Sequence, residues 1–387
     1  MTRCPMCFNA LTPERVSWMA TSGETKIDEV ASRYYGAEVQ TRHIVPSELK
    51  RERNNIVLTP SRALAAAQVG SQVEEVCPYC HYRIPDGWRD SRSTCIAMAG
   101  ARYTGKTVYV AVLIKALQLF GERIGCVVEP NDQRTADTYQ KHYQNTLYVQ
   151  RQMLPPTSSI GVKDPFHRDP LIFRLGHWNG RKQYLVIRDV AGEDLHDQNN
   201  IGQTWTKFFG NADGVVYMFD PLKVPSIASQ LRDLIPAQET YDVAPITVLQ
   251  TVISMIGPHN PKLAVVLSKF DALHALKNVA GTDWSTVMGN PGAGFSRDPS
   301  LIRGPYDNDD GELVDAEVRS LLVKLGAKPI IDAADSPHTG ARLPTRFFAV
   351  SALGALPAGE QVHESGISPF RCLDPARWIL SEAGVWN

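Results

Sequence analysis

Residues 100–107 read Gly-Ala-Arg-Tyr-Thr-Gly-Lys-Thr, and this octet constrains the fold more than any other feature of the chain. It matches the pattern G-x-x-x-x-G-K-[ST] in full. It stands between a short apolar run at 94–99 and a longer apolar stretch at 106–120. We expect a buried strand at the first and a helix at the second. A strand, a glycine-rich turn and a helix in this order form a cradle for phosphate.

The residues of the octet have separate expected roles in binding phosphate and Mg²⁺. Glycines let the backbone curl so that its N–H groups point at phosphate oxygens, and the helix that follows adds the positive end of its dipole. Lys106 is expected to reach the β- and γ-phosphates, and the Thr107 hydroxyl to bind Mg²⁺. The candidate nucleotide-binding residues here are Gly100, Ala101, Arg102, Tyr103, Thr104, Gly105, Lys106 and Thr107.

A second motif, Asp189-Val-Ala-Gly192-Glu193, follows a predicted strand at 184–187. An aspartate at a strand end with a glycine three residues later is how P-loop GTPases sense the γ-phosphate. The aspartate holds Mg²⁺, and the glycine N–H bonds the γ-phosphate and moves when it leaves. The sequence therefore predicts Asp189 as a Mg²⁺ ligand beside Thr107, and Gly192 as a catalytic residue.

Two more predicted strand ends carry residues suited to a nucleobase. The strand at 263–267 leads into Ser268-Lys269-Phe270-Asp271, where the Asp271 carboxylate can accept hydrogen bonds from two N–H groups of guanine. The stem of Lys269 can lie over the base. GTPases usually have Asn-Lys-x-Asp here, so Ser268 is a departure that leaves guanine preference unsettled. The strand at 346–350 ends in Ser351-Ala352-Leu353, whose backbone N–H groups could reach guanine O6.

Strands and helices alternate through the rest of the chain. We predict strands at 94–99, 171–175, 184–187, 214–219, 263–267 and 346–350. We predict helices at 106–120, 131–153, 226–235, 246–256, 312–325 and 375–383. This alternation is typical of an α/β fold with a mostly parallel sheet covered by helices on both faces. Ligands of such sheets bind at the carboxyl ends of strands, where all four motifs stand.

With these motifs in this order, residues 94–387 resemble the Ras-like, translation-factor-related class of P-loop GTPases. The Asp-x-Ala-Gly-Glu switch and a cysteine pair just upstream are similar to those of the bacterial double-GTPase families, proposed components of multi-gene conflict or defence systems. The resemblance implies a Mg²⁺-dependent GTP-hydrolysing switch that signals to a regulator or effector protein. It also implies that Thr157, after Leu154-Pro-Pro, is a second hydroxyl ligand of Mg²⁺. A solvated threonine in a helix-ending turn is the alternative.

Two departures from that class bear on the rate of hydrolysis. Arg102 and Tyr103 occupy loop positions that are usually small, and Arg102 either acts on the phosphates or lies solvated on the loop rim. Glu193 stands where a water-orienting glutamine is common; a γ-phosphate repels it, yet it could hold the attacking water. We take Lys106, Gly192, Glu193 and Arg102 as candidate catalytic residues and expect slow intrinsic hydrolysis.

Four of the seven cysteines form two Cys-Pro-x-Cys pairs, Cys4 with Cys7 and Cys77 with Cys80. Such pairs in a cytosolic chain are more often metal sites than disulfides. Four thiolates suit tetrahedral Zn²⁺. The separation of the pairs is unusually long, but loop-closure entropy grows only logarithmically with length. We predict one zinc ribbon-like site; two unrelated knuckles or a redox pair are the alternatives.

Bulk composition narrows the classes of function. The formal net charge is −1, so no overall field attracts nucleic acid. No apolar run approaches the 18 or so residues of a membrane span, and the first residues lack a signal-peptide pattern. We expect a cytoplasmic protein with a polar, irregular zinc-binding module at 1–92 that contains a long insertion. A Ras-like GTPase domain follows at 93–387, with an insertion near 275–310.

Two other classes of function remain open from the sequence. One is an ATP-using motor or kinase, which Asp271 and the lack of an acceptor-substrate motif disfavour. The other is a pseudo-GTPase, an adaptor that binds nucleotide without turnover and whose zinc module contacts nucleic acid or a partner protein.

Overall fold

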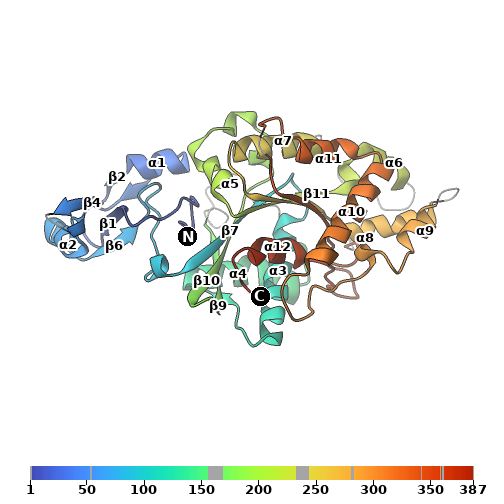
Figure 1. Cartoon of the computed structure of the whole chain (residues 1–387), viewed down its shortest axis with the longest axis horizontal. Helices are drawn as coiled ribbons and strands as arrows, with labels where there is room; N and C mark the ends of the chain where they lie inside the picture. Colours follow the sequence, from blue (N-terminus) through green and yellow to red (C-terminus); the bar gives the residue numbers. More distant parts are fainter. Residues whose placement is uncertain are drawn as a thin grey trace.

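The computed structural model describes residues 2–52, 55–155, 169–231, 244–279, 283–340, 342–357, 359 and 361–386. Their main β structures are a seven-stranded and a four-stranded sheet. The four-stranded sheet lies at the blue, N-terminal end of the elongated molecule (Figure 1). No helix among the described residues is long and apolar enough to cross a membrane.

The large sheet has the order β13-β12-β11-β7-β10-β9-β8. Five strands are parallel: β7 (Arg92–Ala99), β10 (Arg181–Asp189), β11 (Gly214–Phe219), β12 (Lys262–Leu267) and β13 (Thr345–Ala349), which is an edge strand. β9 (Leu171–Trp178) runs antiparallel to both neighbours, β10 and the short β8 (Glu129–Pro130). The predicted α/β fold with a mostly parallel sheet is confirmed.

Helices cover both faces of this sheet, as expected. Along β7, Cys95, Ala97 and Ala99 face one apolar cluster, whereas Ile96 and Met98 face the other. The second cluster contains α3 (Lys106–Arg123), α4 (Gln133–Tyr139) and α12 (Asp374–Ser381). The first contains α5 (Phe208–Asn211), α6 (Pro225–Leu231), α7 (Pro245–Ile256), α10 (Asn308–Lys324) and α11 (Lys328–Asp335). Short helices α8 (Phe270–Leu273) and α9 (Trp284–Met288) follow β12.

The N-terminal region is regular, which corrects the expectation of an irregular module. Its antiparallel sheet, β5-β4-β1-β6, comprises β1 (Arg15–Ala20), β4 (Ile44–Glu52), β5 (Asn55–Thr59) and β6 (Val73–Val76). Helices α1 (Glu29–Tyr35) and α2 (Arg62–Val69) and the pair β2 (Lys26–Ile27) and β3 (Gln40–Thr41) complete it. Among its described residues, only five buried side chains form an apolar cluster of its own, so its strands carry a weak hydrophobic pattern.

Some predicted helices and loops differ from the observed ones. The helix expected at 131–153 is α4 followed by a π-helix at Gln140–Val149. Helix α11 was not predicted. The insertion expected near 275–310 contains a 3-10 turn at Gly294–Ser296, and its last residues already belong to α10. The domain boundary at residue 92 stays a prediction.

Candidate nucleotide and metal sites

The phosphate loop connects β7 to α3, and two glycines let it turn. Gly100 has φ of 142°, and a Cβ there would lie 2.2 Å from the carbonyl oxygen of Met218. Gly105 has φ of 86° and directly precedes α3. Both backbones favour glycine, and the close approach at Gly100 admits no side chain. The loop therefore curls at the carboxyl end of β7, as the octet predicts.

Lys106 and Thr107 begin α3 at the bottom of this loop. Lys106 is buried, and its Nζ donates to the carbonyls of Gly100 at 2.8 Å and Ala101 at 3.0 Å. Burial lowers the pKa of Lys106 to about 8, and the nearby Asp189 charge opposes that shift. The Thr107 hydroxyl donates to the Asp189 carboxylate at 3.2 Å. The two predicted Mg²⁺ ligands that the structure describes thus lie side by side.

The segment after β10 packs directly on the phosphate loop. A Cβ at Gly192 would lie 2.3 Å from the Arg102 backbone nitrogen, so the two loops touch. The Arg102 guanidinium pairs with the Glu193 carboxylate and lies 5.0 Å from the ring centroid of Tyr103. The Arg102 side chain is thus engaged with Glu193 while it remains 27% exposed, and its role stays a prediction. The two candidate catalytic side chains neutralise each other across the mouth of the loop.

A cavity of about 440 Å³ extends from the phosphate loop to the ends of β12 and β13. Its lining includes these predicted residues: Arg102, Tyr103, Thr104, Gly105, Lys106, Thr107, Gly192, Ser268, Lys269, Asp271, Ala352 and Leu353. Gly100, Ala101, Ser351, Asp189 and Glu193 lie behind or beside it rather than in the lining. Thr157 lies outside the described residues, although Leu154 and Pro155 line the cavity.

The predicted base-reading residues are held by their neighbours. Ser351 donates its hydroxyl to the Asp271 carboxylate, which fixes the orientation of that group. Ser268 donates its hydroxyl to the Phe219 carbonyl at 2.8 Å, so it joins the ends of β12 and β11. Lys269 has a left-handed backbone with φ of 49°, and its Nζ lies 2.6 Å from the buried carboxylate of Asp220. Asp220 is a positioning partner that the motif did not reveal.

A C-terminal segment that sequence patterns missed also lines the cavity. It includes Ala355, Leu356, Pro357 and Gly359. Just beyond it, the Val362 N–H donates to the carbonyl of Arg151 at 2.9 Å. This loop therefore touches both the base end of the cavity and the chain that leads to Leu154. The sequence of this loop carries no recognisable motif, because a loop that only forms part of a cavity wall does not require particular residue types at fixed spacing.

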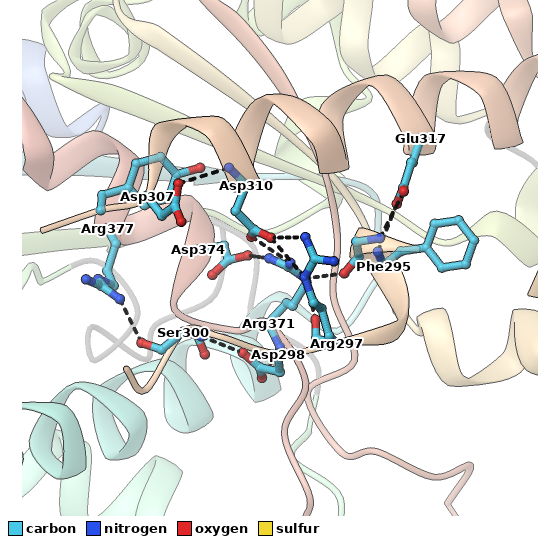
Figure 2. A network of polar contacts seen from close by, with 12 residues as sticks. Phe295, Arg297, Asp298, Ser300, Asp307, Asp310, Glu317, Arg371, Asp374 and Arg377 are labelled. Carbon is cyan, nitrogen blue, oxygen red and sulfur yellow. Dashed lines mark hydrogen bonds and ion pairs between the residues drawn. The ribbon is translucent and has the colours of Figure 1, made fainter. Parts of the chain in front are cut away.

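An ionic network around the buried Arg371 is connected through the backbone to the segment that carries Ser351; Figure 2 shows Arg371 with Asp310 and Asp374. Ser351 and Phe370 exchange two backbone hydrogen bonds, at 3.2 and 2.8 Å. The next residue, Arg371, has a side chain only 1% exposed that pairs with Asp310 at 2.7 Å and with Asp374. Burial raises the pKa of Asp374 to about 6, against the opposing charge of Arg371. The network holds the backbone that carries Ser351.

The four predicted cysteines converge in one buried cluster. Their sulfur atoms lie within 4.8 Å of one another, with Cys4 and Cys80 at 3.7 Å and Cys7 and Cys77 at 3.6 Å. A tetrahedral zinc site with Zn–S bonds of about 2.3 Å has sulfur–sulfur edges of about 3.8 Å. A disulfide would need about 2.05 Å. The arrangement fits a tetrahedral thiolate site.

The two cysteine pairs repeat one local geometry. Phe8 and His81, which follow the second cysteine of each pair, both have left-handed backbones with φ of 57° and 55°. Each donates its N–H to the carbonyl of the first cysteine of its pair, at 3.0 and 2.9 Å. Although burial acts to raise it, hydrogen bonds from the other three cysteines lower the pKa of Cys7. His81 is turned away to Asp28, at 2.7 Å.

The cysteine cluster belongs to the core of the large sheet. All four cysteines lie in the same apolar cluster as β7, β10 and β11, and not in that of the four-stranded sheet. Trp88 stacks on Tyr184 of β10 with ring centroids 4.6 Å apart, and Arg3 pairs with Asp213 at 3.2 Å. The long excursion from Cys7 to Cys77 forms the four-stranded sheet and its helices. The sequence did not reveal this contact.

His196 follows the Asp189-Val-Ala-Gly192-Glu193 motif. It is half-buried after the 3-10 turn at Glu193–Leu195, and its Nε2 has no hydrogen-bond partner among the described residues. Burial lowers its pKa, and the nearby Lys106 charge adds to that shift.

Comparison with known proteins places the chain in a family. No protein-family model matches it. Over 388 residues it is 45% identical to a Mycolicibacterium smegmatis protein named "Putative ESX-1 scaffolding and assembly protein SaeC", and the match covers 100% of both chains. The chain belongs to the SaeC family. The name of the SaeC protein refers to scaffolding and assembly, and it lends no support to the conflict or defence role that the resemblance implied.

Solved structures similar to this SaeC-family chain include three proteins of low identity. They are the bacterial selenocysteine-specific elongation factor EF-Sec (10% identity, TM-score 0.25, covering 67% of this chain), the GTPase-like domain of S. cerevisiae Ski7 (11%, 0.34, 76%) and Aquifex aeolicus Era (12%, 0.25, 68%). The chain spans 25%, 50% and 52% of those structures, respectively.

Proposed function

We propose that this chain is a Mg²⁺-dependent switch that binds GTP, hydrolyses it slowly, and acts through protein partners in scaffolding and assembly. The observation that carries the proposal is the single cavity lined by the phosphate loop, Gly192 and Asp271. The lining has phosphate-binding groups at one end and a fixed carboxylate at the other, as a bound nucleotide requires. Assembly, rather than defence, follows the name of the relative.

At the phosphate end, the chain supplies one cation and two oxygen ligands. The Nζ of Lys106 exchanges its carbonyl partners for β- and γ-phosphate oxygens, which restore its full charge. Thr107 and Asp189 are placed to hold Mg²⁺, whose charge offsets that of the phosphates. Thr157, outside the described residues, is proposed as the further hydroxyl ligand.

At the base end, Asp271 favours guanine over adenine. Its carboxylate accepts the Ser351 hydroxyl and keeps lone pairs for the two neighbouring N–H groups that guanine presents. Adenine offers no such pair of donors, so it would leave a fixed carboxylate without its partners. This arrangement disfavours the ATP-using alternative.

The pairing of Arg102 with Glu193 supports slow hydrolysis. Each side chain is engaged with the other, so neither the arginine charge nor the glutamate oxygen is free for the γ-phosphate and its attacking water. A partner that separates the pair would place Arg102 on the transferred phosphate, the task of an arginine finger. A pseudo-GTPase adaptor is the second candidate, and the scaffolding name of the relative favours it.

The four cysteines are proposed to hold one structural Zn²⁺. The sulfur–sulfur distances fit the tetrahedron, and bound zinc would supply cross-links within the N-terminal region. The division into a zinc module at 1–92 and a GTPase domain at 93–387 is part of the same proposal, as is the cytoplasmic location.

The nucleotide that co-purifies with the chain, and its affinity for Mg·GTP, Mg·ATP and Mg·XTP, test the proposal. Asp271→Asn should weaken GTP at least about tenfold and favour XTP, because the hydrogen-bond pattern is exchanged. Asp309→Asn, at an exposed residue of α10, is the matched control. Equal affinity for GTP and ATP would refute the assignment of the base site, and binding without single-turnover hydrolysis would select the adaptor.

A further inference from the structure

Strand β10 presents two consecutive side chains to opposite faces of the large sheet. Asp189 faces α3, where it accepts the hydroxyl of Thr107. Arg188 faces the cysteine cluster, where its Nη1 donates to the Met6 carbonyl at 2.7 Å and to the Tyr34 hydroxyl at 2.9 Å. Successive strand residues alternate between faces, so one backbone position controls both contacts. A shift of Arg188 therefore shifts the proposed Mg²⁺ ligand beside it.

The chain returns to the same cysteine pair about twenty residues later. Phe208, the first residue of α5, lies under the Arg188 guanidinium at 3.9 Å from its ring centroid. Phe208 also packs edge-on against Phe8, with centroids 5.5 Å apart. Asn211, at the end of α5, donates its amide to the Cys7 carbonyl at 3.3 Å. We call residues 189–207 the switch segment; it is held at both ends by residues 6–8.

The residues that make these anchoring contacts are largely excluded from solvent. Met6 and Phe8 are 1% and 0% exposed, and Phe208 is 0% exposed. Charge-assisted hydrogen bonds and cation–π contacts are strongest where water is excluded. The part of the switch segment between the anchors is different: Glu193 is exposed and Gly192 contacts the phosphate loop. The segment therefore has rigid ends and a middle that can respond to a γ-phosphate.

Resting on the proposed function, we propose that metal in the four-cysteine site controls the nucleotide site. A tetrahedral ion on Cys4 and Cys7 fixes Met6, which lies between them, and Phe8, which follows Cys7. These two residues in turn position Arg188 and α5. The switch segment is then held against the phosphate loop in the arrangement that binds Mg·GTP. Loss of the metal releases both anchors and weakens nucleotide binding.

Thermodynamic linkage supplies the test. If metal strengthens nucleotide binding by some factor, nucleotide must strengthen metal binding by the same factor. The affinity of the full chain for a fluorescent Mg·GTP analogue is measured with zinc bound and after zinc removal. The rate of zinc transfer to a chromogenic chelator is measured with and without the non-hydrolysable Mg·GTP analogue. We expect zinc to tighten nucleotide binding at least about fivefold and nucleotide to tighten zinc binding by the same factor, so that zinc release is slower with nucleotide bound.

Tyr34→Phe tests the route of the coupling. The variant removes the hydroxyl that donates to Met6 at 3.0 Å and accepts from Arg188, and it leaves the ring in place. Tyr35→Phe, one residue along α1, is the matched control. In zinc-loaded protein, Tyr34→Phe should reduce the nucleotide effect on zinc release, because Arg188 loses one of its two hydrogen-bond partners on this side of the sheet, whereas Tyr35→Phe should keep the full effect.

The outcomes separate this inference from the proposed function. GTP binding with the same affinity in zinc-loaded and zinc-free chain, together with unchanged zinc release, would overturn the coupling alone. Equal coupling in Tyr34→Phe and Tyr35→Phe would overturn its route. Failure of the zinc-loaded chain to bind Mg·GTP at all would overturn the proposed function and this inference with it. If zinc removal unfolds the chain, the rates of zinc release from the folded, zinc-loaded protein with and without nucleotide still test the coupling.

Discussion

Raising the pH should weaken nucleotide binding through one side chain, Lys106. Burial lowers its pKa to about 8, whereas the unfolded chain has the ordinary value of 10.5. A lysine with a lowered folded pKa destabilises the fold below that pKa, and the cost disappears as pH rises from about 8 toward 10.5. The shift corresponds to about 3 kcal/mol. Phosphate oxygens bind the charged form, so nucleotide binding should draw a proton onto Lys106.

The magnitude follows from that pKa. Lys106 is about nine-tenths protonated at pH 7 and about one-tenth at pH 9, so nucleotide affinity should fall roughly tenfold across that range. At about pH 8.5, binding should take up roughly 0.8 proton per nucleotide. Calorimetry in two buffers of different ionisation enthalpy measures this uptake, after subtraction of the nucleotide's own titration.

Lys106→Arg is the control for this prediction, because a guanidinium stays charged throughout the range. The variant should show almost no proton uptake and little loss of affinity between pH 7 and pH 9. Equal proton uptake by wild type and Lys106→Arg would mean that Lys106 is already charged in the free protein. That result would refute the argument from burial.

Two further predictions concern the metal and the rate. Purified chain should contain about one zinc, by the four-ligand count, and Cys77→Ser should lose it; metal analysis that finds none in protein never exposed to chelator would contradict the site. Single-turnover hydrolysis of GTP should be slow in the isolated chain. Arg102→Ala should slow it further, by roughly tenfold or more, because the Glu193 carboxylate then faces the γ-phosphate without its cation. Fast wild-type turnover that Arg102→Ala leaves unchanged would show a complete catalytic apparatus without any partner.

The central sheet was predictable because its strands are buried on both faces. Runs such as that in β12, with every residue buried, differ sharply from the loops around them. The N-terminal strands were not predictable for the opposite reason. β4 mixes Pro46 and Ser47 with charged residues, and only a few side chains of its sheet are buried. A small core leaves little periodic signal in the sequence.

Of the candidate site, the sequence by itself determined the groups that need a particular chemistry at a particular spacing. The phosphate loop, Asp271 and the four cysteines are of this kind, and parallel strands must bring the first two to one edge of the sheet. The tertiary structure alone decided how these groups are connected. Arg102 meets Glu193, and Arg188 meets Met6, across separations of 91 and 182 residues. Contacts of this kind depend on how the helices and the sheets pack together. They join residues far apart in the chain, so no local sequence pattern predicts them.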